Sequence, residues 1–169
     1  YRVAIFSSAL AKRILQDKSD EVFIAGLLHD IGAFDLPDHI IHYLELHQSI
    51  RDKSMLSHPI VGSEIVASLG STINIARIIL NHHEWFDGRG YPRGLKNNEI
   101  PLESQILHIA DSMDIVARHY KGEAKYKGII GLLKGGINTE YSQFLYDEFI
   151  SVIKDNLLFC GLKDEDKLK

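Results

Sequence analysis

Apolar residues recur every three to four positions along most of the chain. The segment RVAIFSSALAKRIL carries this spacing from Val3 to Ile14, which predicts an amphipathic helix. The following segment, SDEVFIAGLLHDIG, is apolar on almost every side and ends on a glycine. We therefore expect a core helix over residues 19–32 that stops at Gly32.

The same spacing predicts further helices over residues 36–46, 58–70, 71–84, 101–120, 128–136 and 142–157. Three of the chain's prolines stand near expected helix starts, where a missing N–H is tolerated: Pro37, Pro59 and Pro101. Residues 86–98 are rich in glycine, asparagine and charge, which predicts a long loop between two core helices. No segment alternates with the period of two typical of strands, so the expected fold class is all-α.

Composition indicates an ordinary globular domain. The chain has 169 residues, 45% of them hydrophobic and 25% charged, so we treat 1–169 as a single domain. No apolar run approaches the ~20 residues of a membrane span, and no long basic run favours a nucleic-acid polymer. Cys160 is the only cysteine, which fits a reducing compartment, so we expect a cytoplasmic protein. The sequence opens directly in a helical pattern without methionine, and we expect it to belong to a longer chain.

Histidine is frequent, at nine residues, and several of these histidines stand beside carboxylates. Six residues suited to metal binding sit at helix ends or on apolar helices: His29, Asp30, His58, His82, His83 and Asp111. Imidazoles combined with carboxylates favour Mn, Fe, Zn or Ni over Ca or Mg. The six could hold two metals bridged by Asp30, and a hydroxide between two metals is a strong nucleophile for phosphoryl displacement.

Each of these residues alone also has an ordinary structural interpretation. The His29–Asp30 pair could be a capping interaction, His58 could simply start a helix, and Asp111 could be a buried hydrogen-bond acceptor. Adjacent side chains on a helix point about 100° apart, so His82 and His83 can meet at one site only at a helix end. The ordered combination of all six on predicted helices is what favours a metal centre.

Four motifs, LLHDIG, HPIVGSEIV, HHEWFDGRGYPRGLKNNEIPL and ILHIADSMDIV, follow one another in an order that resembles the HD-GYP domain. This is a subfamily of HD-type metal-dependent phosphohydrolases linked to cyclic di-GMP breakdown, and the resemblance covers essentially the whole chain. It implies an all-α helical bundle and a site with two or three divalent metals. The family's ligands carry over onto the same six residues, with His29 and Asp30 at the catalytic centre.

The resemblance also implies contacts for the substrate. RHYK at 118–121 is similar to the family's R-P-Y-R/K element, so Arg118 and Lys121 are expected to reach phosphates. The loop over residues 86–98, called the GYP loop after Gly90-Tyr91-Pro92, is expected to shape the pocket. It adds three candidates for substrate binding: Arg89, Arg93 and Tyr91. For Tyr91, packing within the loop is an equally good interpretation. Glu84 and Asp87 are expected to brace the loop or support the ligands.

Several positions depart from the family pattern. Ala33 replaces a lysine expected near the substrate phosphate, and Asp35 stands where a glycine is common. His119 replaces the proline of the R-P-Y-R/K element. His108 takes a small apolar position one turn before Asp111, where it could add to the site or fill a polar gap. The family's first-helix histidine would precede Tyr1.

The leading hypothesis is a metal-dependent phosphodiesterase that hydrolyses cyclic di-GMP to linear pGpG or GMP through attack of a metal-bridging hydroxide. Fe or Mn is expected first, with Ni, Co and Zn as alternatives. A competing hypothesis is a catalytically weak module that binds a cyclic dinucleotide or partner proteins. Hydrolysis of another cyclic dinucleotide or of a nucleotide is a third hypothesis. Signalling proteins that dock on the GYP loop, and a second copy in a homodimer, are the candidate protein partners.

Overall fold

The computed structural model describes residues 1–33, 53–70, 72–119 and 123–159. They form seven α-helices and two short 3₁₀ helices: α1 (Arg2–Leu15), α2 (Ser19–Leu28), η1 (Ile31–Ala33), α4 (Lys53–Ala67), α5 (Ile73–Leu80), η2 (Asn97–Glu99), α6 (Leu102–His119), α7 (Glu123–Gly135) and α8 (Gln143–Phe159). Within these ranges the only strand-like pairing is an isolated bridge between Ile137 and Tyr141. The all-α prediction is confirmed, while the helix expected over 36–46 lies outside the described residues.

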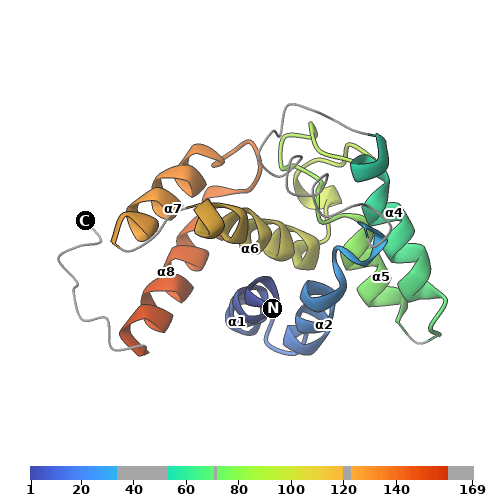
Figure 1. The fold of residues 1–169 in the computed structure, drawn as a ribbon, viewed down its shortest axis with the longest axis horizontal. Helices are drawn as coiled ribbons and strands as arrows, with labels where there is room; N and C mark the ends of the chain where they lie inside the picture. The colour runs from blue at the N-terminus through green and yellow to red at the C-terminus, as the bar shows by residue number, and fades with distance from the viewer. Residues whose placement is uncertain (34–52, 71, 120–122, 160–169) are drawn as a thin grey trace.

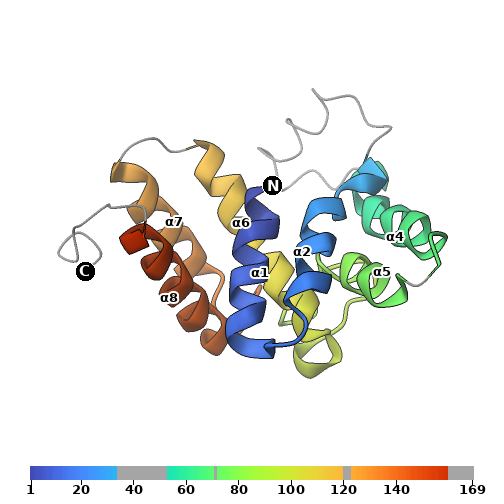
Figure 2. The ribbon, with the colours of Figure 1, turned by 90° about the horizontal axis from the view of Figure 1, so that it is seen from below.

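Helix α6 runs through the middle of the molecule, with α4 and α5 at one end and α7 and α8 at the other (Figures 1 and 2). Helix α1 packs against α2, α6 and α8, and α4 packs against both α5 and η1. The end of α2 and the start of the loop after α5 therefore meet α6 on one side of the bundle. None of the described helices is both long enough and apolar enough to cross a membrane.

The hydrophobic core surrounds α6 because most of that helix's apolar residues face a neighbouring helix. α6 supplies Ile106, Leu107, Ile109, Ala110 and Met113, all buried. Burying one large aliphatic side chain stabilises a fold by about 1.5–3 kcal/mol, so this central helix is fixed firmly. Asp111 is buried on the same helix, where a carboxylate needs compensating partners.

Helix α2 ends earlier than the sequence predicted. It stops at Leu28, His29 forms its C-cap, and the chain then tightens into η1. A Cβ on Gly32 would lie 2.1 Å from the carbonyl oxygen of His58 and 2.5 Å from the backbone nitrogen of Gly62, so only glycine allows this approach to α4. The prediction of a continuous helix to Gly32 was wrong because the chain turns here to pack against α4.

Other helix boundaries were also wrong, including the start of α7, which lies at Glu123 rather than at residue 128. Helix α4 begins at Lys53, which places Pro59 inside the helix, at a cost of about 3 kcal/mol for an interior proline. Pro59 is buried, and its packing offsets part of that cost. Helix α5 ends at Leu80, where the side chain of Asn81 donates to the carbonyl of Arg77 at 2.8 Å. The paired histidines therefore follow the helix in a turn rather than occupying its last turn.

Candidate metal centre

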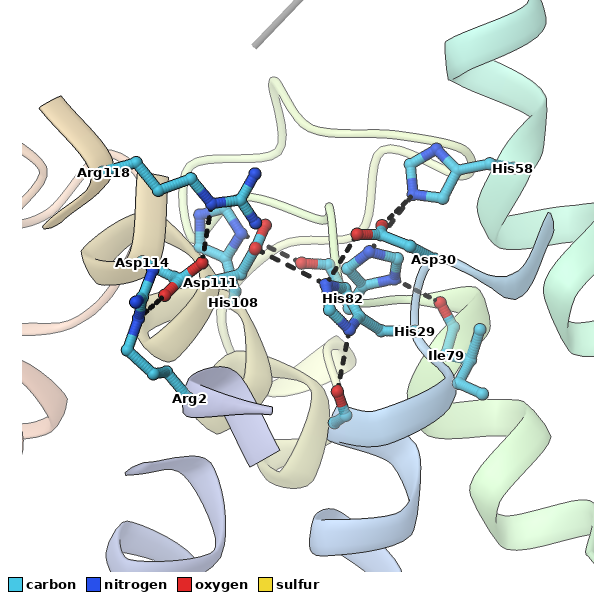
Figure 3. Close-up of polar contacts among 11 residues, drawn as sticks. Arg2, His29, Asp30, His58, Ile79, His82, His108, Asp111, Asp114 and Arg118 are labelled. Carbon is cyan, nitrogen blue, oxygen red and sulfur yellow. Dashed lines mark hydrogen bonds and ion pairs between the residues drawn. The ribbon is translucent and has the colours of Figure 1, made fainter. Parts of the chain in front are cut away.

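His29 presents one ring nitrogen to two carboxylates. Its Nδ1 donates to the carbonyl of Gly26 at 2.9 Å. Its Nε2 lies 3.0 Å from Asp30 Oδ2 and 3.5 Å from Asp111 Oδ1 (Figure 3). Burial opposes a charge on His29, but Asp30 and Asp111 together raise the pKa of the imidazole well above its usual value. The three side chains thus gather one nitrogen and two oxygens around a position that attracts positive charge.

Asp30 faces two imidazoles at once. While one carboxylate oxygen lies beside His29, Oδ1 lies 3.5 Å from Nε2 of His58. Partial loss of solvent around the carboxylate alone would raise the pKa of Asp30, but His29 and the other nearby imidazoles hold it well below its usual value, so the carboxylate is ionised near neutral pH. Its side chain is 53% exposed, whereas His58 is fully buried. A carboxylate with its two oxygens turned toward different imidazoles is suited to bridging two cations.

His58, His82 and His83 form a second group of donors. Their ligand atoms all lie within 4.8 Å of one another, close enough to hold one metal ion. His82 donates from Nδ1 to the carbonyl of Ile79 at 2.6 Å, which leaves its Nε2 as an acceptor 3.3 Å from Nε2 of His58. Two nitrogens bound tetrahedrally to one ion at 2.0–2.1 Å would be about 3.3 Å apart.

Two imidazoles of the second group, His82 and His83, are held in the neutral form that a metal needs. Burial, followed by the neighbouring imidazoles, lowers the pKa of both His82 and His83 well below the usual value. Neutral imidazoles keep the lone pair that a metal ligand requires. The described donors are nitrogen and oxygen without sulfur, which fits first-row transition metals such as Mn and Fe. The structure thus brings all six predicted ligands into two donor groups that meet at Asp30.

The loop after the paired histidines is held by a buried carboxylate. Glu84 is only 1% exposed and accepts the backbone N–H groups of Arg93 at 2.6 Å and Leu95 at 2.9 Å. Sequence reasoning expected Glu84 to brace the loop or support the ligands, and its position is that of a loop brace. Asp87 accepts hydrogen bonds from Arg89 instead, one of them from Nε at 2.6 Å.

The GYP segment folds back onto His83. The N–H of Tyr91 donates to the carbonyl of His83 at 3.0 Å, and the two rings stack with centroids 4.8 Å apart. A Cβ on Gly90 would lie 2.2 Å from the backbone nitrogen of Trp85 and 2.4 Å from the carbonyl oxygen of His83. Glycine is therefore required for the loop to reach the histidine pair, and Tyr91 lies directly against a predicted ligand.

Two of the cations predicted to bind phosphate, Arg118 and Arg89, have carboxylate partners of their own. Arg118 donates from Nε to Asp114 at 2.9 Å, and Arg2 binds the other oxygen of that carboxylate at 2.5 Å (Figure 3). Arg89 pairs with Asp87 and lies over the ring of Trp85. Of the remaining two candidates, Arg93 is exposed on the loop and Lys121 lies outside the described residues.

Sequence reasoning missed contacts made by the connection between α7 and α8. The N–H groups of Phe86 and Asp87 donate to the carbonyls of Glu140 and Thr139, at 3.1 and 3.0 Å. Backbone carbonyls carry no signature in a sequence, so no pattern could have indicated them. His108, which the sequence left open between site and filler, donates from Nδ1 to the carbonyl of His82 at 2.9 Å.

A family model described as the HD domain matches residues 5–132. The chain belongs to the HD domain family. This confirms the resemblance found in the sequence motifs. Among relatives, a cyclic di-GMP phosphodiesterase of Thermotoga maritima is 33% identical over 151 residues, which are 86% of this chain and 41% of the relative. A 3′3′-cGAMP-specific phosphodiesterase 3 of Vibrio cholerae is 27% identical, over 82% of this chain and 31% of the relative.

Solved structures share the helical fold of this HD domain. A cyclic GMP-AMP phosphodiesterase from V. cholerae superposes with a TM-score of 0.71 at 16% identity, covering 98% of this chain and 46% of that one. The HD domain of the L. monocytogenes phosphodiesterase PgpH, in complex with cyclic di-AMP, has a TM-score of 0.65 at 20% identity, covering 96% of this chain and 90% of that one. The chain spans about two fifths or less of the length of the two sequence relatives named above.

Proposed function

We propose that this HD domain hydrolyses a phosphodiester bond of a cyclic dinucleotide, with cyclic di-GMP as the first candidate and linear pGpG or GMP as the product. The convergence of three imidazoles and two carboxylates carries the proposal (Figure 3): His29, His58, His82, Asp30 and Asp111. The relatives support the substrate class, because their names specify cyclic di-GMP or cGAMP phosphodiesterases.

The proposed metal centre divides between the two donor groups. His29, Asp111 and one oxygen of Asp30 would hold one divalent ion; His58, His82, His83 and the other oxygen of Asp30 would hold a second. Fe or Mn fits these donors first. Bound there, two such ions would supply Lewis acidity and charge stabilisation for an in-line phosphoryl displacement.

The protein's own groups would orient the diester. Asp30 is the half-exposed member of the centre, so substrate would approach from its side. We propose that Arg118, with Lys121, contacts a phosphate, and that Asp114 fixes the direction of the Arg118 guanidinium through their 2.9 Å hydrogen bond. Tyr91, stacked on His83, would form one wall of the pocket, and Arg89 and Arg93 remain loop candidates for the second phosphate.

Hydrolysis is tested with the chain reloaded anaerobically with Mn or Fe. It is incubated separately with cyclic di-GMP, 3′3′-cGAMP and cyclic di-AMP, and products are resolved by chromatography. We expect metal-dependent turnover of at least one substrate, lost in Asp30→Asn and unchanged in Lys12→Ala, which alters an exposed residue of α1. The absence of turnover with all three substrates, at full metal loading, would contradict the proposal.

A second candidate function is a catalytically weak module that mainly binds a cyclic dinucleotide, and Ala33 favours it. Ala33 stands where the resemblance expects a phosphate-contacting lysine, and it is 5% exposed in η1. Loss of one charge-assisted contact costs about 1.5–3 kcal/mol, roughly a 10- to 200-fold loss in rate. That loss slows a reaction without abolishing it. Retention of a cyclic dinucleotide without turnover, in both the wild type and Ala33→Lys, would establish the binding module instead.

A further inference from the structure

We propose that His108 is a positioning residue for the paired histidines, supported from behind by the turn between α7 and α8 (residues 136–142). His108 lies in the middle of α6 and is 5% exposed. Its Nδ1 donates at 2.9 Å to the carbonyl of His82, which belongs to the peptide that joins His82 to His83. One hydrogen bond from the central helix therefore fixes the peptide between two candidate ligands. The inference rests on the proposed metal centre.

The opposite side of the His108 ring faces Glu140. Nε2 of His108 lies 3.5 Å from Oε2 of Glu140 and makes no hydrogen bond within the described part of the chain. The same turn reaches the loop directly after His83, because the carbonyl of Glu140 accepts the N–H of Phe86 at 3.1 Å. The paired histidines are thus held from α6 on one side and, through the loop, from the α7–α8 turn.

The turn is firm enough to serve as a support. Tyr141 is buried, and its hydroxyl donates to the carbonyl of Leu133 in α7 at 2.5 Å. The N–H of Asn138 donates to the carbonyl of Tyr141 at 2.8 Å, and the hydroxyl of Thr139 donates to the carbonyl of Gly136 at 3.0 Å. These bonds close the turn on itself and tie it to α7.

The paired histidines need such a support because they lie beyond the end of α5. Helical geometry no longer fixes the direction of the peptide between them, and two adjacent side chains converge only for a limited range of peptide orientations. Their ring centroids are 4.0 Å apart, and both rings lie close to His58. Groups that orient metal ligands typically change metal affinity by about 10–100-fold when removed.

The test compares three substitutions of His108. In His108→Asn the amide nitrogen takes roughly the place of Nδ1 and can still donate to the carbonyl of His82. In His108→Gln the amide lies one carbon further out, near the place of Nε2, and that bond is lost; His108→Ala removes both groups. We expect Mn affinity, measured by metal titration of the whole chain, to fall about 10–100-fold in the Gln and Ala variants and to recover in Asn.

A readout without metal separates this inference from the proposed function. In the metal-free chain, the backbone amide signal of His83 in a nitrogen–proton NMR spectrum should shift in His108→Gln and return toward the wild-type position in His108→Asn. Equal Mn affinity in all variants, or an Asn variant that resembles Gln, would overturn the positioning role while leaving the metal centre intact. If the wild type binds no metal, the proposed function fails, and an unchanged His83 signal in His108→Gln overturns the inference separately.

Discussion

Gly90 lies where the GYP loop touches the backbone of the paired histidines. A Cβ there would meet three backbone atoms of residues 83–85 at 2.2–2.6 Å, none of which can move independently of the loop. We expect Gly90→Ala to lower the free energy of unfolding by about 1–3 kcal/mol, the usual range for overpacking. Urea unfolding followed by circular dichroism measures the change.

Gly131 provides the matched control for this substitution. It lies inside α7, and a Cβ there meets nothing within 4 Å. Gly131→Ala should therefore stabilise the chain by roughly 0.5–1 kcal/mol through helix propensity alone. If Gly90→Ala were as stable as Gly131→Ala, the loop would not need glycine at this approach.

At the scale of the helices, Asp114 forms an ion pair that links α6 to α1. It is buried and binds Arg2 of α1 and Arg118 of its own helix. Burial raises the pKa of Asp114, but the two arginines outweigh it and hold the pKa below its usual value. A lowered pKa means that the ionised pair stabilises the fold above the unfolded value, about 3.9, and that this stability is lost as the pH falls through the folded value.

Asp114→Asn tests this linkage. Both arginines are about half exposed, so solvent screens the pair and the expected loss of stability at pH 7 is about 1 kcal/mol. The difference between wild type and variant should shrink as the pH falls below about 4, where the wild-type carboxyl becomes protonated. Urea unfolding over a pH series measures it, with Asp17→Asn at an exposed position of the α1–α2 connection as the control. A difference that does not change with pH would rule out the charge pair as its source.

At the scale of the helices, the sequence predicted which segments form helices but not where those helices end. Apolar spacing identified α1, α5, α6 and α8 because each buries one face in the core. The ends of α2 and α5 depended on specific contacts that apolar spacing does not encode. Gly32 turns the chain because α4 lies against it, and Asn81 closes α5 through a local hydrogen bond that no periodicity reveals. Those two ends place His29 and His82 at the site.

At the scale of the whole molecule, the sequence allowed the candidate metal ligands to be predicted. The backbone contacts that hold those ligands in place could not be predicted. Histidine and aspartate side chains are common metal ligands, and the order of the motifs indicated that these residues converge. The contacts behind them involve carbonyls of Ile79, Thr139 and Glu140, which any residue could supply. Only the three-dimensional structure, in which the loop after α5 packs against the α7–α8 turn, shows which residues do so.

The candidate ligands come from segments that are far apart in the chain, so metal binding should stabilise the whole fold. One donor group joins the end of α2 to α6, and the other joins α4 to the turn after α5. A ligand at 100 times its dissociation constant adds about 2.7 kcal/mol, which for a chain of this length corresponds to a rise in the unfolding midpoint of roughly 5–10 °C. We expect Mn to produce this rise in a thermal scan and a chelator to reverse it. Mg, which prefers oxygen ligands and keeps its bound waters, should produce a much smaller rise.

His58→Ala removes a buried imidazole of the second donor group, so the unfolding midpoint of this variant should respond less to Mn than that of the wild type. Equal midpoints with and without Mn in the wild type would mean that the described donors do not hold a metal in the folded chain.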